Sequence, residues 1–210
     1  MENYFKVTTT SKVNIFGITL FQLELTVDCK WGKKGDKGGW IESEFLPNGD
    51  ARVSGDAWVY GDARVSGDAR VSGDAWVYGD ARVSGNAQVY GDARVSGDAR
   101  VYGDARVSGN AQVYGYAWVS GDAQVYGNAW VSGDAQVYGN AWYKSPLQIQ
   151  GTRHFVNICA KGILRIGCKR FEISFWLDKF KEIGKDEGYT EQEIEEYGMY
   201  IELANKLNKD

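Results

Sequence analysis

The sequence has little proline, histidine and cysteine, and no long apolar run. Only two prolines accompany 27 glycines in 210 residues, which is typical of recurrent tight turns rather than of a disordered linker. Without about 20 consecutive apolar residues, no transmembrane helix is expected. Residues 1–12 are too polar for the apolar part of a signal peptide. We therefore expect a cytoplasmic protein that does not enter a membrane.

Neither the spacing of the cysteines nor the distribution of charge indicates a metal site or nucleic-acid binding. Cys29, Cys159 and Cys168 are odd in number and lack metal-ligand spacing, so we expect reduced thiols and neither metal nor cofactor. The net charge of −4 arises wholly between residues 50 and 143, where seven arginines face eleven aspartates. No basic stripe suited to phosphates occurs, so we expect no sequence-independent nucleic-acid binding.

What the chain does have is a six-residue repeat. Sixteen hexads follow one another from Gly49 to Lys144, and residues 49–66 recur letter for letter as residues 67–84. A fixed period of six predicts a β-helical solenoid. An α-helix is excluded because a glycine in every hexad would cost about 1 kcal/mol each and the 3.6-residue period is missing.

Each hexad predicts which side chains face inward. Alanine and valine lie two residues apart, as in Ala51 and Val53, and therefore share a face of a strand. The residue between them and the Ser or Tyr after valine are expected to point outward. Gly-Asp or Gly-Asn turns the corner, because both types tolerate positive φ. The eighteen-residue duplication predicts three faces per coil and slightly more than five coils.

The spacing of Val53 and Ala57, repeated through Val137 and Ala141, resembles the left-handed parallel β-helix of the hexapeptide-repeat superfamily. The resemblance covers residues 49–144 and implies a mainly β, triangular solenoid. We expect residues 1–48 to form an N-terminal β cap, residues 49–146 the solenoid, and residues 147–210 a small α/β unit with two helices.

The flanking segments give the expected elements. A strand is expected over residues 16–27. In the C-terminal unit, strands are expected at residues 155–158 and 163–168, followed by a helix that Ser174 caps and that ends near residue 183. A last helix is expected to begin at Thr190, which forms a capping box with Glu193, and its apolar stripe ends near Leu207. We expect this last helix to dock on the strands and the solenoid end; a free partner-binding helix is the alternative.

Two looser resemblances concern origin. Residues 33–46 (KKGDKGGWIESEFL), leading into the repeats, resemble the entry segment of bacterial single-stranded β-helix proteins named as acyltransferases. The layout, with Gly167-Cys168 and the tail residues Tyr197, Ile201, Leu203 and Ala204, is similar to repeat proteins of phages and prophages. The second resemblance implies a phage-encoded protein acting in a bacterial host cytoplasm.

Enzymes of the superfamily use a histidine base or hold zinc with three histidines. His154 is the chain's one histidine and lies after the last hexad, so a three-histidine zinc site is impossible. The repeats also lack a protruding loop, and we expect no catalytic residues. A calcium site is the weaker alternative to backbone geometry as the reason for the corner aspartates.

The outward side chains are the candidate partner-binding residues. With eighteen residues per coil, they stack into ladders that mix aromatic and arginine side chains, as protein interfaces do. The same ladders could also stabilise the strands without any partner, and stacking of a sugar or nucleotide on the aromatic rings is a further alternative. The candidate partner-binding residues are Trp58, Tyr60, Arg64, Trp76, Tyr78, Arg82, Arg100, Trp118 and Trp130.

The sequence therefore favours a non-catalytic scaffold that binds a macromolecular partner. We expect a host protein as the partner, with inhibition of a host defence component as the most specific form of the hypothesis. A structural phage-particle or self-assembling protein, including a homo-oligomer, is the second reading. An acyltransferase or its inactive remnant is the third.

Overall fold

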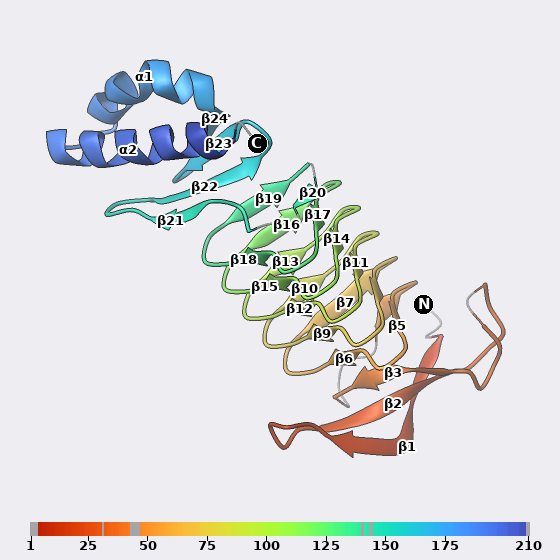
Figure 1. The fold of residues 1–210 in the computed structure, drawn as a ribbon. Coiled ribbons are helices and arrows are strands. Elements are labelled where there is room, and N and C mark those ends of the chain that lie inside the picture. The colour runs from red at the N-terminus through yellow and green to blue at the C-terminus, as the bar shows by residue number, and fades with distance from the viewer. Residues whose placement is uncertain (1–3, 31, 43–46, 140, 143–144, 209–210) are drawn as a thin grey trace.

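The computed structural model describes residues 4–30, 32–42, 47–139, 141–142 and 145–208. Its chain forms an elongated stack of coils with strands at the N-terminal end and a small sheet carrying two helices at the other end (Figure 1). The mainly β solenoid of about five coils expected from the hexads is confirmed. Its left-handed winding stays a prediction.

Three parallel sheets run along the stack, because each strand pairs with the strand one coil later. Arg82 lies between Arg64 and Arg100 in the ladder, so one coil takes eighteen residues, as predicted. The Arg82 N–H donates to Ala99 O at 2.9 Å, and the Ser84 N–H donates to Val101 O at 2.9 Å. The register changes only at the last coil, where Gln124 pairs with Ala141 instead of Trp142.

We name the faces by their side chains. The tryptophan face consists of β6 (Trp58–Val59), β9 (Trp76–Val77), β12 (Arg94–Val95), β15 (Gln112–Val113) and β18 (Trp130–Val131). The arginine face consists of β4 (Asn48–Gly49), β7 (Arg64–Gly67), β10 (Arg82–Val83), β13 (Arg100–Val101), β16 (Trp118–Ser120) and β19 (Gln136–Tyr138). The third face consists of β5 (Arg52–Val53), β8 (Arg70–Val71), β11 (Gln88–Val89), β14 (Arg106–Val107), β17 (Gln124–Val125) and β20 (Ala141–Trp142).

The core of the solenoid is made of alanine and valine, as the alternation predicts. From Ala69 to Val137 each inward Ala and Val is fully buried, and removing this apolar surface from water drives the stacking. The corners differ from expectation in one respect. Among the described residues only glycines take positive φ, so the following Asp or Asn lies in ordinary backbone.

The N-terminal strands extend the tryptophan face and close one end of the core. They are β1 (Phe5–Val13), β2 (Thr19–Leu25) and β3 (Lys37–Ile41). β1 and β2 form an antiparallel hairpin, and β3 pairs in parallel with β6, with Trp40 opposite Trp58. Leu23 and Ile41 join the solenoid's own apolar core.

The C-terminal unit is an antiparallel sheet covered by two helices. Its strands are β21 (Gln148–Gln150), β22 (Phe155–Ala160), β23 (Ile163–Ile166) and β24 (Lys169–Glu172), followed by α1 (Ile173–Asp186) and α2 (Glu191–Leu207). The predicted capping box of Thr190 and Glu193 starts α2. The predicted cap at Ser174 is wrong: Glu172 is the N-cap residue, and the Ser174 hydroxyl donates to the Glu172 carboxylate at 3.3 Å.

Side chains of the C-terminal unit occupy the open backbone groups of the last coils. Gln148 accepts from the Ser132 N–H at 2.7 Å and donates to Trp130 O at 2.8 Å. The Asn157 amide donates to Gln136 O at 2.8 Å. Unpaired strand edges invite pairing with another chain, and these bonds close that edge. No helix in the described part of the chain has the length and apolarity needed to cross a membrane.

Candidate protein-binding surface

Three arginines form a row along the arginine face. Arg64, Arg82 and Arg100 lie one above another in consecutive coils, and all three are exposed. They point outward because alanine and valine on either side of each arginine face the core. Within the described residues, Arg64 and Arg82 have no ion-pair partner. Like charges in neighbouring strand positions repel each other, and no direct ion pair within the described residues relieves this repulsion at Arg64 or Arg82.

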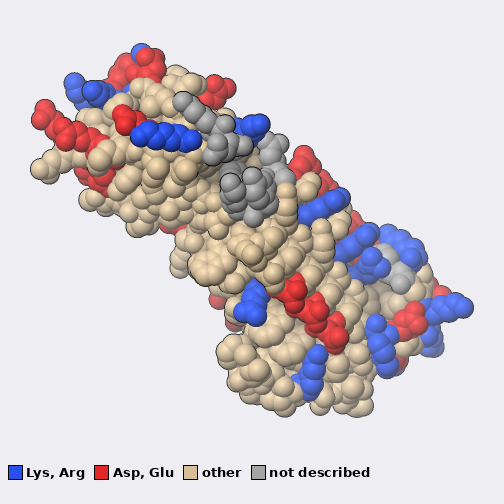
Figure 2. Space-filling view, in the orientation of Figure 1, with Lys and Arg blue, Asp and Glu red and all other residues tan. Residues whose placement is uncertain are grey.

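Exposed aspartates border this row on both sides. Asp62, Asp80 and Asp98 lie at the corner before the arginine strands, and Asp68 and Asp104 lie at the corner after them. Figure 2 shows a similar charge pattern on its visible face, where acidic side chains lie in a narrow row along the stack with basic side chains beside them. The face therefore presents a narrow positive ridge rather than a broad basic field.

The arginine row ends on aromatic side chains. The Arg100 guanidinium lies 5.2 Å from the ring centre of Trp118, and Tyr102 meets the same ring edge-on at 6.2 Å. Tyr116 replaces the usual corner aspartate and is 64% exposed. Cation–π contacts of this kind are worth about 0.5–1 kcal/mol at exposed sites.

A groove opens beside these aromatic residues at the junction with the C-terminal unit. Its volume is about 320 Å³, and its lining is Asp98, Arg100, Tyr116, Trp118, Asp134, Gln136 and Arg165. Arg165 belongs to β23 and donates to Asp134 O at 2.7 Å. No sequence pattern indicates a role for Arg165, because its approach to the solenoid depends on how the C-terminal sheet docks.

The tryptophan face differs because its first coils are held by internal contacts. The rings of Trp58 and Trp76 stack at 4.8 Å with an angle of 5°. The Lys12 ammonium of β1 lies 4.7 Å from the Trp58 ring centre, and the Arg94 guanidinium lies 4.8 Å from that of Trp76. Burial lowers the pKa of Lys12, although Asp56, 3.7 Å away, opposes this effect. The tryptophan pair is therefore clamped between two cations of the same chain.

Tyr60 corrects one expectation. We expected its side chain to point into solvent, but it is 5% exposed, with its ring stacked on Tyr78 at 5.1 Å. Burial raises the pKa of Tyr60 to about 12. Its hydroxyl is buried, and Tyr60 therefore packs within the structure and offers almost no surface to a partner.

The nine candidate residues lie on two faces, as a coil of eighteen residues predicts. Arg64, Arg82, Arg100 and Trp118 lie together on the arginine face. Trp58, Tyr60, Trp76, Tyr78 and Trp130 belong to the tryptophan face. Trp130 is 51% exposed and meets Tyr114 edge-on at 6.5 Å. The arginine face places exposed arginines directly beside Trp118, with the Arg100 guanidinium over its ring.

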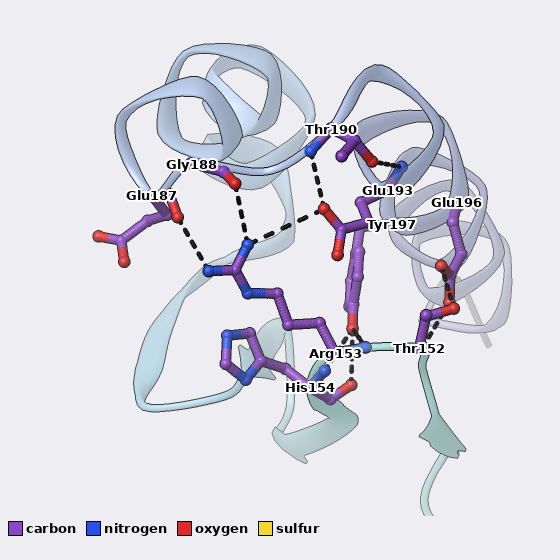
Figure 3. A network of polar contacts seen from close by, with 9 residues as sticks. All are labelled: Thr152, Arg153, His154, Glu187, Gly188, Thr190, Glu193, Glu196 and Tyr197. Atoms are coloured by element: carbon purple, nitrogen blue, oxygen red, sulfur yellow. Dashed lines mark hydrogen bonds and ion pairs between the residues drawn. The ribbon is translucent and has the colours of Figure 1, made fainter.

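His154 lies in a separate polar network that fastens α2 to the C-terminal sheet (Figure 3). The Tyr197 hydroxyl donates to His154 O at 3.0 Å and accepts from the N–H groups of Arg153 and His154. The Thr152 hydroxyl donates to the Glu196 carboxylate at 2.6 Å. The apolar spacing of the last helix includes Tyr197, but that spacing assigns no partner to its hydroxyl.

The Arg153 side chain completes this network. Its guanidinium donates to Gly188 O and Glu187 O, and it lies 4.7 Å from the Tyr189 ring centre. The cavity beside His154 measures only about 40 Å³. These contacts position the α1–α2 connection. Across the part of the chain that the structure describes, no three His, Cys, Asp or Glu side chains gather as metal ligands do.

Comparison with known proteins supports the repeat architecture. A family model described as the YdcK β-solenoid repeat matches in seven windows, of which the first six overlap, at residues 63–79, 75–91, 87–103, 93–109, 99–115, 105–121 and 123–139. No curated protein matches the chain. The matched windows lie wholly within the coils and reach neither terminal unit. The chain is therefore a β-solenoid repeat protein, similar in its coils to the YdcK repeat.

Proposed function

We propose that this chain is a non-catalytic binding protein whose arginine face docks a protein partner. The observation that carries the proposal is the exposed row of Arg64, Arg82 and Arg100 that ends on Trp118. Arginine and tryptophan are enriched among the residues that dominate protein interfaces. The nearby groove gives the flat face a concave end where a side chain of a partner can be enclosed.

The uniformity of the coils supports a role without catalysis. A catalytic site would need at least one hexad that breaks the pattern with a histidine or an inserted loop, and the sixteen hexads contain neither. His154, the one histidine of the sequence, has its neighbours engaged in fastening α2. We propose further that the partner is a host protein, such as a defence component in a bacterial cytoplasm. Support for this step is the resemblance to phage and prophage repeat proteins.

The closed ends of the solenoid favour discrete particles over columns. Gln148 and Asn157 occupy backbone groups of the last coils, and β3 pairs with the first strand of the tryptophan face. End-to-end stacking of copies would have to displace these contacts. A partner on the side of the solenoid requires no such displacement.

The test is capture of a partner from a bacterial lysate with two matched variants. We expect one stoichiometric protein to bind the wild type, and Arg64→Glu/Arg82→Glu to reduce its recovery at least tenfold. Arg70→Glu/Arg106→Glu changes two exposed arginines of the third face by the same charge, and this control should bind as the wild type does. Equal recovery with both variants, or no partner for the wild type, would contradict the proposal.

A further inference from the structure

The spacing and borders of the arginine row restrict the shape of its partner; this inference rests on the proposed function. Stacked rings on the neighbouring face give the rise of one coil directly, with 4.8 Å between Trp58 and Trp76. Three arginines in consecutive coils therefore span roughly 10 Å along the solenoid axis. A complementary element must place about three negative groups over that length.

An α-helix lying along the axis meets this requirement. One acidic residue per turn gives a spacing of about 5.4 Å and a span of roughly 11 Å over three residues. Side chains on one side of an extended strand recur about every 6.8 Å and span roughly 14 Å. The span of the helix exceeds that of the arginine row by about 1 Å, and the span of the strand exceeds it by about 4 Å. The flexible arginine side chains can accommodate the smaller mismatch more easily.

The aspartate borders restrict the partner further. Asp62, Asp80 and Asp98 on one side, with Asp68 and Asp104 on the other, leave room for only one row of negative charge between them. A nucleic-acid duplex presents phosphates across its whole width and would bring them against both borders. A helix with a central row of acidic residues and a row of basic residues on each side is complementary to the arginine row and to both aspartate borders.

The end of the row supplies an apolar contact. Trp118 is 36% exposed and Tyr116 is 64% exposed, and both line the groove that Arg165 borders. A helix over the arginines would bring its end to this groove. An aromatic or aliphatic residue one turn beyond the last acidic residue can therefore pack against Trp118.

We infer that the partner of the arginine face is an amphipathic acidic α-helix that lies along the solenoid axis. It carries one acidic residue per turn over Arg64, Arg82 and Arg100, basic residues over the aspartate borders, and an apolar residue against Trp118. Opposite charges thus give orientation and register, and the aromatic contact fixes which end lies near the C-terminal unit.

Labelled synthetic peptides test this inference with the full chain by fluorescence anisotropy. The probe is a side-chain-stapled helix with glutamates at positions i, i+4 and i+7, lysines beside them and a leucine at position i+11. A second stapled helix has the same composition with glutamates distributed around its axis. An unstapled peptide with alternating glutamates serves as the extended probe, and a double-stranded DNA oligonucleotide as the nucleic-acid probe.

We expect the first peptide to bind at least tenfold more tightly than each other probe, with an affinity that falls as salt is added. Arg64→Glu/Arg82→Glu should weaken it at least tenfold, Trp118→Ala at least threefold, and Arg70→Glu/Arg106→Glu less than twofold. Equal binding of the scrambled helix, or tighter binding of the extended peptide or the oligonucleotide, would overturn the inference.

The two proposals fail separately. If the captured protein depends on Arg64 and Arg82 while no helical peptide binds, the arginine face is a docking surface and the helix inference is wrong. If Arg64→Glu/Arg82→Glu leaves the captured protein bound, the docking surface itself is wrong.

Discussion

Glycine at the first position of each hexad is required for two separable reasons. Gly85 has φ of +68°, and a Cβ there would lie 3.0 Å from the Gly103 nitrogen in the next coil. Gly121 has φ of +61°, but a Cβ there would meet no described atom within 4 Å. A side chain at position 85 would therefore meet both backbone strain and crowding, whereas one at position 121 would meet the strain alone.

We expect Gly121→Ala to lower the free energy of unfolding by about 1–2 kcal/mol, the cost of a left-handed conformation. Gly85→Ala should cost about 1–3 kcal/mol more, because the neighbouring coil must move. Chemical denaturation followed by circular dichroism measures both. The same loss for the two variants would show that the coils relax freely around an added methyl group.

Residue-level prediction succeeded where the environment repeats and failed where a distant segment intervenes. The inward Ala69 and Val71 follow from a period of two, and the structure buries both completely. Tyr60 follows the same rule as Tyr90, which is 39% exposed, yet Tyr60 is buried near the solenoid's N-terminal end. Its position in the hexad carries no information about which coil is covered.

Among the elements, the three N-terminal strands are linked by one carboxylate. Glu24 of β2 forms ion pairs with Lys6 of β1, at 2.8 Å, and with Lys37 of β3. The hydrogen bond from Lys37, followed by that from Lys6, lowers the pKa of Glu24 from 4.5 to about 2. Because the folded pKa lies below the unfolded value, the stabilisation is complete above about pH 4.5 and is lost as the pH falls through about 2.

Glu24→Gln should therefore lower the melting temperature at pH 7 and leave it unchanged near pH 2. Thermal melts of the wild type and the variant at pH 7, 4.5 and 2 measure the difference. Thr19→Val, at an exposed position on the same strand, is the control for a change without loss of a carboxylate. A Glu24→Gln effect of equal size at every pH would mean that packing, and not charge, explains the role of Glu24.

Elements with local signals were predicted better than elements made by pairing. The start of α2 follows from Thr190 and Glu193, which satisfy each other's backbone N–H groups within one turn. Strand β1 was not predicted, because residues 5–13 are largely polar and become a strand by pairing with β2. Strand β21 likewise gains its partner, β22, only in the folded chain.

At the scale of the whole molecule, repetition predicts the middle of the solenoid and leaves its ends unspecified. The duplicated residues 49–84 gave the coil length, and the pairing of Arg64 with Arg82 confirms it. Neither the extension of the tryptophan face by β3 nor the closing role of Gln148 could be read from the hexads. Both depend on contacts between segments with unrelated sequence patterns.

The closing side chains should keep copies of the protein from joining end to end. Gln148→Ala/Asn157→Ala frees the Ser132 N–H and the carbonyls of Trp130 and Gln136. Each lost hydrogen bond should cost about 1 kcal/mol, and the freed edge can pair with another chain. We expect the mass of this variant, measured by light scattering after size exclusion, to rise with concentration. Gln150→Ala, whose side chain hydrogen-bonds to Gly151 O and to no other described residue, should keep the wild-type mass throughout. If the double variant keeps that mass too, then the packing of the C-terminal sheet alone closes the solenoid, and the side-chain hydrogen bonds add stability without preventing assembly.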